Sequence, residues 1–412
     1  MKLLIENFYN IKHAELDFKK FNILIGPQAA GKSLIAKVLY FFEESLLTQN
    51  LEETFESDTH LTQKKILDLF NNIFETHTLS NDFGLTFTTR DDAKYTITSE
   101  GFHKHGNHKT EKQTIIETKQ FIEKALDESV KTEALMTGKS ENEILGKRKQ
   151  NIIEDIQKEL IHGITTSMGK IHIFIPASRS LVNIIADNSF WVDNDNIDIL
   201  LKRFGRIYSQ DIHKLTKNDS FSCPPLNDVL KGKIYKLDKK YIVANDSNAV
   251  SLGNASSGQQ AVIPLVVALN SPDKRATHKY IEEPEAHIFP AAQQQLIKYI
   301  AKIHNNELSM VTLTTHSPYI LTATNTLIYA GTVGKQSEEK AAKVREIIPE
   351  DQWLNAEDVA ACMVEADGSV RSIFDEETGL IDADSIDDVS DVIGSEFNKI
   401  LDIEFEEEAG DA

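Results

Sequence analysis

The stretch of sequence that decides the fold reads Phe21-Asn22-Ile23-Leu24-Ile25-Gly26-Pro27-Gln28-Ala29-Ala30-Gly31-Lys32-Ser33. It opens with an apolar run broken only by one asparagine, which predicts a short strand buried in the centre of a sheet. The loop that follows matches the pattern G-x-x-x-x-G-K-[ST] at every required position. An apolar-periodic stretch from Ser33 to Phe42 predicts a helix directly after the loop.

A loop of this kind, between a buried strand and a helix, is typical of phosphate binding. Its glycines let backbone N–H groups turn inward around a β-phosphate, and the helix start adds the positive end of its dipole. We expect Lys32 to bridge the β- and γ-phosphates of a nucleotide and Ser33 to ligate Mg²⁺. The residues predicted to contact the nucleotide here are Gly26, Pro27, Gln28, Ala29, Ala30, Gly31, Lys32, Ser33 and Leu34.

A second motif, Tyr280-Ile281-Glu282-Glu283-Pro284-Glu285-Ala286-His287, places paired carboxylates at the end of a predicted strand. Ligands of α/β proteins bind at the carboxyl ends of the strands. One carboxylate of the pair can hold Mg²⁺, and the next can polarise an attacking water molecule. Taken alone, the motif is equally well explained as an acidic, solvated turn.

Two further segments could contact phosphate. The run Asn254-Ala255-Ser256-Ser257-Gly258-Gln259-Gln260 opens a predicted helix, with Ser256 as its N-cap, and its hydroxyls and helix dipole could form an anion site. A capped helix without a ligand would look the same. In the run Thr314-Thr315-His316-Ser317-Pro318, a histidine follows a predicted strand and could donate to a γ-phosphate, although a lone histidine is often structural.

The order of these four motifs resembles the ABC-type ATPase head that SMC, RecF-like and OLD-like proteins share. The Glu-Glu-Pro run and the Ser-Ser-Gly-Gln variant are most similar to the OLD-like branch, often labelled AAA-family ATPases. The opening run from Leu4 to Lys12 and the run Ile175-Pro176-Ala177-Ser178-Arg179-Ser180 also fit that branch. Many of its members are bacterial anti-phage ATPases, such as the ATPase subunits of Septu and PARIS.

The resemblance implies a role for each motif residue. Lys32, Glu283 and His316 would be catalytic, with Glu283 as the catalytic carboxylate and His316 as the switch histidine. Ser33 and Glu282 would hold Mg²⁺, although most ABC heads have Asp where Glu282 stands. The residues that would contact ATP bound to a second, head-to-tail copy of the chain are Ser256, Ser257, Gly258 and Gln259.

The sequence departs from the family pattern after the strand predicted at Ile171–Ile175. ABC heads have a glutamine there, and this chain has none within a few residues. Arg179 occupies that region, and we consider it a candidate sensor of nucleotide or of a partner.

Strands alternating with helices predict an α/β fold. In detail we expect an ABC-type head with a mixed sheet, a mainly helical insertion arm and a small α+β C-terminal extension. The expected division is residues 1–42 and 171–325 for the head, 43–170 for the insertion, and 326–412 for the acidic extension. The insertion should contain a hairpin, Gly84–Thr89 with Tyr95–Thr98, and two long helices, Lys112–Met136 and Glu141–Ile161. A further helix is expected near Ile386–Leu401.

Composition limits the classes of partner. The formal net charge of −20 opposes general coating of nucleic acid, although a local basic groove stays possible. Cys223 and Cys362 are isolated and lack metal-ligand spacing, which favours a reducing cytoplasm. No apolar stretch is long enough to span a membrane, and the start does not read as a signal peptide.

Three functions remain open at this stage. The first is an ATPase sensor or scaffold of an anti-phage system whose effector, such as a nuclease, is a separate protein. The second is a DNA-repair ATPase that clamps DNA, for which Lys147-Arg148-Lys149 is the one compact basic candidate. The third is an assembly module that binds ATP without hydrolysing it.

Overall fold

A computed structural model shows how these segments fold. It describes residues 1–54, 59–74, 79–90, 92–105, 172–185, 197–216, 220–237, 240–270, 278–307 and 309–382. None of the helices in this described part of the chain is long and apolar enough to cross a membrane.

A six-stranded mixed sheet forms the centre of the molecule, with strand order β14-β13-β3-β12-β11-β7. Its strands run parallel except for β14, which pairs antiparallel with β13. Their bounds are β3 Phe21–Ile25, β7 His172–Ile175, β11 His278–Glu282, β12 Met310–Thr315, β13 Val359–Val364 and β14 Val370–Ser372. The predicted α/β fold with a mixed sheet is confirmed.

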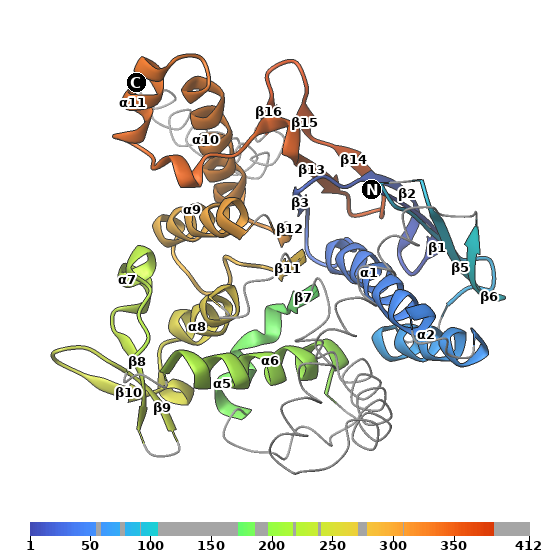
Figure 1. The fold of residues 1–412 in the computed structure, drawn as a ribbon, viewed down its shortest axis with the longest axis horizontal. Helices are drawn as coiled ribbons and strands as arrows, with labels where there is room; N and C mark the ends of the chain where they lie inside the picture. Colours follow the sequence, from blue (N-terminus) through green and yellow to red (C-terminus); the bar gives the residue numbers. More distant parts are fainter. Residues whose placement is uncertain are drawn as a thin grey trace, which may run out of the picture.

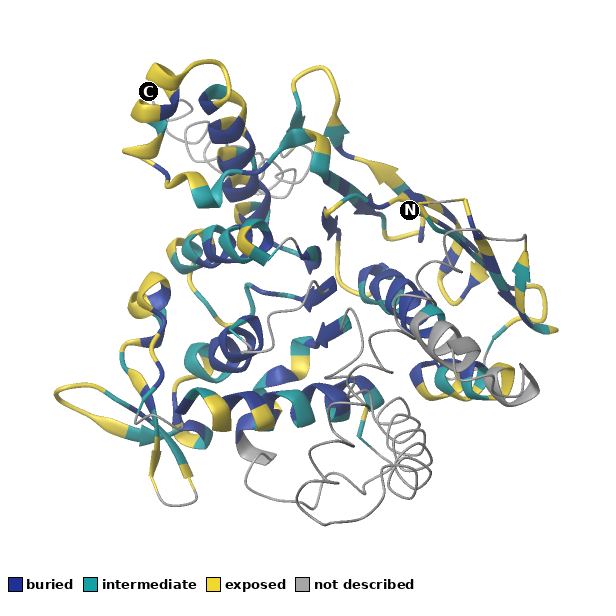
Figure 2. Ribbon diagram, in the orientation of Figure 1, coloured by how far each residue is buried: buried dark blue, intermediate teal, exposed yellow. Residues whose placement is uncertain are grey.

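Helices cover both faces of this sheet (Figures 1 and 2). Every residue of β3 is buried, and its side chains alternate between two hydrophobic clusters, as a central strand requires. Phe21, Ile23 and Ile25 pack with helices α8, α9 and α10, whereas Leu24 packs with α1. The bounds are α1 Lys32–Thr54, α8 Ser257–Leu269, α9 Pro290–Glu307 and α10 Pro318–Gly334.

A second, antiparallel sheet has the order β2-β1-β4-β5-β6 and packs against α1 and α2 Thr59–Ile73. Its strands are β1 Lys2–Phe8, β2 Ile11–Asp17, β4 Gly84–Thr88, β5 Lys94–Thr98 and β6 Gly101–His105. The hairpin that we predicted inside the insertion arm forms β4 and β5, and β4 pairs with β1. This sheet buries Leu85, Phe87 and Tyr95 in the same hydrophobic cluster as α1.

The remaining described elements surround the larger sheet. A short antiparallel sheet, β10-β9-β8, lies beside α7. The bounds of these elements are β8 Lys233–Leu237, β9 Lys240–Ala244, β10 Ala249–Ser251, α5 Val182–Ile185, α6 Ile199–Thr216, α7 Asn227–Leu230, α11 Glu338–Arg345, β15 Phe374–Asp375 and β16 Leu380–Ile381.

Two differences from the sequence analysis concern helices. Helix α1 continues to Thr54, beyond Phe42 where we expected it to end, because Phe41 and Phe42 remain in the core beneath the second sheet. The helices predicted at Lys112–Met136, Glu141–Ile161 and Ile386–Leu401 lie outside the described residues.

Candidate active site

Three of the four motifs meet at one edge of the six-stranded sheet. Strands β3, β12, β11 and β7 run parallel, so their carboxyl ends share that edge. The register pairs Ile25 with Thr315 and Glu282 with Thr314. The phosphate loop, His316 and the paired carboxylates therefore emerge side by side, although they are far apart in the sequence.

The phosphate loop needs its two glycines for steric reasons. Gly26 has φ +152°, and a Cβ there would lie 2.0 Å from the carbonyl oxygen of Val364 at the end of β13. Gly31 has φ +114° and lies against Ile11. From the β1–β2 turn, the Asn10 side chain donates to the Ala29 and Ala30 carbonyls at 3.1 and 2.8 Å. The sequence analysis gave Asn10 no role.

The predicted loop residues differ in exposure. Pro27, Gln28 and Ala29 are exposed at the tip of the loop, whereas Gly26, Ala30 and Lys32 are buried. Ser33 and Leu34 are partly buried in the first turn of α1.

Lys32 and the two predicted catalytic side chains form a continuous chain of polar contacts. The Nζ atom of Lys32 donates to the carbonyls of Gly26 and Pro27 at 2.8 and 2.6 Å and lies 3.2 Å from Nδ1 of His316. The other ring nitrogen of His316, Nε2, lies 3.0 Å from Oε1 of Glu283. The side chains of His316 and Glu283 remain 29% and 35% exposed, so a ligand can reach both.

Burial and charge act on Lys32 in opposite directions. Burial lowers the pKa of its ammonium group, and the carboxylates of Glu283 and Glu285 oppose that shift. A phosphate group would add further negative charge and favour the charged lysine.

Glu283 has a strained backbone. Its φ of +43° lies in the left-handed region, which is uncommon for a residue with a Cβ and frequent at functional sites. Its N–H donates to the Thr314 carbonyl at 2.8 Å, and its own carbonyl accepts from Arg179 at 2.9 Å. These two bonds hold the peptide that presents the carboxylate.

Glu282 fits the predicted role of a magnesium ligand. Its carboxylate is buried, and Oε2 accepts from the Ala177 N–H at 3.0 Å. Its Oε1 atom is also buried and has no hydrogen-bond partner in the described part of the chain. A buried carboxylate oxygen without a partner is costly, and a bound cation would offset that cost. Ser33 at the start of α1 is the second predicted ligand.

Glu285 is a site residue that the sequence analysis quoted without a role. Its Oε1 atom accepts from the Thr315 hydroxyl at 2.7 Å and from the His316 N–H at 2.8 Å. In the same segment, the Ser317 hydroxyl donates to Oε1 of Gln293 at 2.6 Å. The sequence signal for this role was the position of Glu285 two residues after Glu283. That its turn faces the end of β12 is seen only in the structure.

The Ser-Ser-Gly-Gln segment starts α8, as predicted. Ser256 is the N-cap, and it forms a capping box with Gln259. Ser256 and Ser257 are exposed. Gly258 approaches the turn after the carboxylates, since a Cβ there would lie 3.0 Å from the His287 carbonyl. Gln259 is engaged within the chain, because its amide donates to the Leu230 carbonyl at 2.7 Å.

Arg179 does not lie where a direct sensor of nucleotide or of a partner would lie. Its side chain is fully buried, and its guanidinium donates to backbone carbonyls of this chain. Burial lowers its pKa to about 10, with Glu285, Glu283 and Glu282 opposing the shift, so the group stays charged near neutral pH. The expectation of a direct sensor is wrong, because every guanidinium nitrogen already has a partner.

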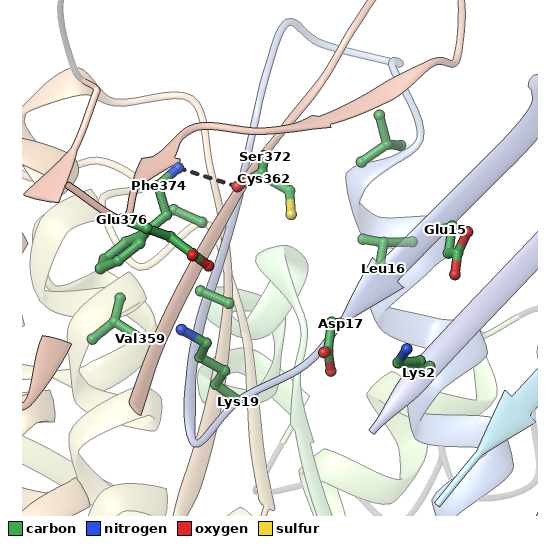
Figure 3. A pocket seen from close by; sticks show the side chains of 13 residues that line it. Lys2, Glu15, Leu16, Asp17, Lys19, Val359, Cys362, Ser372, Phe374 and Glu376 are labelled. Atoms are coloured by element: carbon green, nitrogen blue, oxygen red, sulfur yellow. Dashed lines mark hydrogen bonds between the residues drawn. The ribbon is translucent and has the colours of Figure 1, made fainter. Parts of the chain in front are cut away.

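A separate cavity of about 350 Å³ lies between β2 and strands β13 and β14 (Figure 3). Lys2, Lys19, Glu15 and Asp17 contribute charges of both signs to its lining. Its lining includes β13 from the first residue, Val359, to Cys362, whereas the motifs lie beyond the carboxyl end of that strand. The cavity is therefore not part of the candidate site.

A family model described as "AAA ATPase domain" matches residues 1–321. No curated protein sequence gives a significant match.

Several solved structures are similar at low identity. An SMC head bound to the C-winged helix domain of ScpA is 11% identical, covering 92% of this chain and 98% of that one, with a TM-score of 0.41. The SMC head domain from Thermotoga maritima is 11% identical, covering 78% and 90%, with a TM-score of 0.34. The recombination mediator protein RecF is 12% identical, covering 90% and 97%, with a TM-score of 0.32.

The family model spans most of the chain, from β1 to the first turn of α10, and includes all four motifs. This chain is therefore a member of the AAA ATPase domain family.

Proposed function

We propose that this protein hydrolyses ATP at the edge formed by β3, β11 and β12, and that hydrolysis switches a head-to-tail pair of chains. The observation that carries the proposal is the chain of contacts from Lys32 through His316 to Glu283. It joins a phosphate-binding cation to a carboxylate that can accept a proton, with a histidine between them to orient both.

Each side chain has a distinct task in this proposal. The loop N–H groups and Lys32 bind the β- and γ-phosphates. Glu283 orients a water molecule and takes its proton as the water attacks the γ-phosphorus. His316 holds the Glu283 carboxylate in place through Nε2. Mg²⁺, held by Ser33 and Glu282, would neutralise phosphate charge.

The head-to-tail pair is supported by the start of α8. Ser256 and Ser257 are exposed at a helix N-terminus, which favours anions, and neither fills a core, since Ser256 caps the helix and Ser257 begins it. In a head-to-tail pair this surface would cover the nucleotide of the second copy. ATP would then stabilise the pair, and hydrolysis would release it.

We further propose that the switch serves as the sensor or scaffold of an anti-phage complex and controls a separate effector, such as a nuclease. The support is the motif order and the Glu-Glu-Pro and Ser-Ser-Gly-Gln runs, which resemble the OLD-like branch. The basic triplet at 147–149, on which the DNA-clamp alternative depends, lies outside the described residues.

The deciding experiment compares the full-length wild type with Glu283→Gln. We expect the variant to bind ATP with an affinity close to that of the wild type, to lose turnover by about 100-fold or more, and to gain mass in solution when ATP is added. The exposed Glu338→Gln serves as the control, because its carboxylate pairs with Arg345 on the surface, away from the candidate site.

Three results would contradict the proposal. If Glu283→Gln retains turnover, Glu283 is not the catalytic carboxylate. If the wild type binds ATP and never hydrolyses it, the assembly-module alternative is favoured. If neither protein changes mass when ATP is added, the ATP-dependent pair is excluded. Copurification of an effector from the native host, analysed by mass spectrometry, tests the anti-phage role separately.

A further inference from the structure

One buried arginine joins two parts of the site that would act on different nucleotides. Arg179 lies in the 3₁₀-helix η2 Ala177–Leu181, between α8 and the end of β11. Its Nε donates to the Ala261 carbonyl of α8 at 2.8 Å. Its Nη1 and Nη2 donate to the Glu282 and Glu283 carbonyls at 2.7 and 2.9 Å. One planar group therefore connects the start of α8 to the backbone of both carboxylates.

A second bond, from Asn183, replaces part of the backbone hydrogen-bond ladder of α8. Pro264 lies inside α8 and has no N–H to donate to the carbonyl of Gln260, four residues earlier. The Asn183 amide donates to that carbonyl at 2.7 Å instead, and Asn183 is held by the Tyr208 hydroxyl at 2.8 Å. The segment from η2 to α5 is thus hydrogen-bonded to the first turns of α8 at two consecutive carbonyls.

Arg179 also stabilises the strained backbone of the acidic turn, which we define as Glu282–Glu285. Glu283 has a φ of +43°, which persists only when neighbouring contacts hold it. The Arg179 bond to its carbonyl is one such contact, and the Ala177 N–H fixes the Glu282 carboxylate from the same segment. A shift of η2 would therefore move both carboxylates.

We propose that Arg179 is a positioning residue that couples the two composite sites of the head-to-tail pair. This inference rests on the proposed function. In such a pair, α8 of one chain contacts the partner's nucleotide, whereas Glu283 of that chain acts on its own. A displacement of α8 when the partner binds ATP is transmitted through Arg179 to the Glu283 peptide. Each site then becomes competent only when the other is filled.

The chemistry of arginine is essential to this role. A guanidinium donates in several fixed directions in one plane, so it can connect α8 and the acidic turn at once. A lysine ammonium at this position keeps the charge but acts as a single point donor, and it cannot hold both elements in the same geometry. Arg179→Lys therefore removes the connection with little change in charge.

The test uses the full-length chain with Arg179→Lys and with Arg203→Lys as the matched control. Arg203 is also buried, but it donates to the Tyr40 hydroxyl of α1 and does not contact the acidic turn. We measure binding of a fluorescent ATP analogue, turnover, and the Hill coefficient for ATP. For Arg179→Lys we expect binding within about threefold of wild type, turnover lower by about tenfold or more, and a Hill coefficient falling from well above 1 to about 1.

The proposal is overturned if Arg179→Lys keeps the wild-type Hill coefficient, if the wild type itself shows no cooperativity, or if Arg203→Lys has the same effect. Asn183→Ala is the second variant, because it removes one of the two bonds to α8 and leaves Arg179 bonded to both α8 and the acidic turn. We expect it to lower the Hill coefficient to a smaller extent, and no change there also counts against the coupling.

A readout without turnover separates this proposal from the proposed function. If the wild type does not hydrolyse ATP, the proposed function fails, and the coupling is judged from hydrogen exchange. On adding ATP, we expect the amides of 257–262 and 283–287 to become protected together in the wild type and independently in Arg179→Lys. Identical exchange in the two proteins would overturn the coupling.

Discussion

The Nε2 atom of His316 lies 3.0 Å from Oε1 of Glu283, while its Nδ1 atom lies 3.2 Å from Nζ of Lys32. A neutral imidazole has one donor and one acceptor nitrogen. If Nε2 donates to the Glu283 carboxylate, Nδ1 is the acceptor that faces the Lys32 ammonium. With this tautomer, one ring contacts both the Glu283 carboxylate and the Lys32 ammonium group.

Replacing His316 by alanine should leave ATP binding within about threefold and lower turnover by about 10- to 100-fold, because Glu283 remains present but is no longer held. Single-turnover kinetics and equilibrium binding measure the two quantities separately. His213→Ala is the control, since that ring is exposed and contacts Lys236, outside the candidate site. A variant with unchanged turnover would show that the Glu283 contact is not used.

Replacing Glu285 by alanine should lower both stability and turnover. It removes the acceptor for the Thr315 hydroxyl and the His316 N–H, which should cost about 1–3 kcal/mol in the free energy of unfolding. Glu285→Gln retains a carbonyl oxygen and should recover most of that stability. Chemical denaturation distinguishes the two variants, and equal stability of both would argue against this account.

Glu285→Gln should also change the pH dependence of ATP binding. Burial lowers the pKa of Lys32, and the charge of Glu285 opposes that shift, so its removal lowers the pKa further. The charged lysine is present below its pKa and is lost as pH rises through it. The alkaline limb of ATP binding should therefore move to lower pH in Glu285→Gln. A titration with no shift of this limb would show that the charge of Glu285 does not act on Lys32.

Gly26→Ala should prevent ATP binding, whereas Gly253→Ala should be tolerated. A Cβ at Gly26 would lie 2.0 Å from the Val364 carbonyl oxygen, and the φ of +152° disfavours any side chain. At Gly253 a Cβ meets no atom within 4 Å. Equilibrium binding of ATP and thermal unfolding test the pair. Normal binding by Gly26→Ala would mean that β13 does not constrain the loop.

Glu43 should contribute to resistance against acid. It is buried on α1, and it contacts His278 and Tyr280 at 2.8 and 2.6 Å. Burial alone would raise its pKa, but His278, His172 and these hydrogen bonds lower it to about 2, from 4.5. The resulting stability is present above about pH 4.5 and is lost as pH falls toward 2.

Glu43→Gln should remove that pH dependence and keep a carbonyl acceptor for Tyr280. We expect the free energy of unfolding to fall by on the order of 2 kcal/mol at neutral pH and to change less between pH 5 and about 3. Unfolding by acid, followed by circular dichroism, measures the pH dependence of stability in the two proteins. The same acid midpoint in both proteins would show that Glu43 titrates normally.

Local patterns were sufficient to predict the strand, loop and helix at Phe21–Phe42 and the motif ends of β11 and β12. Their relative position also followed from the sequence, because the carboxyl ends of neighbouring parallel strands lie at one edge. Apolar periodicity and the special conformations of glycine are properties of short segments, which is why they can be read without a structure.

Long-range pairing was not predictable in the same way. Strand β13 lies beside β3, so Val364 determines that residue 26 is glycine. The β4–β5 hairpin joins β1 instead of an arm. Neither contact leaves a local signal, because an apolar strand can pair with several edges, and the choice depends on which pairing buries the most apolar surface in the whole molecule.

The sequence by itself determined the residue types of the site and the edge at which they gather. The tertiary structure alone decided the partners of Arg179 and Glu285, one bonded to α8 and the acidic turn, the other to the start of the His316 segment. The physical reason is that a buried charged group must be matched by hydrogen-bond partners, and the chain positions that provide them are known only once the strands and helices have packed.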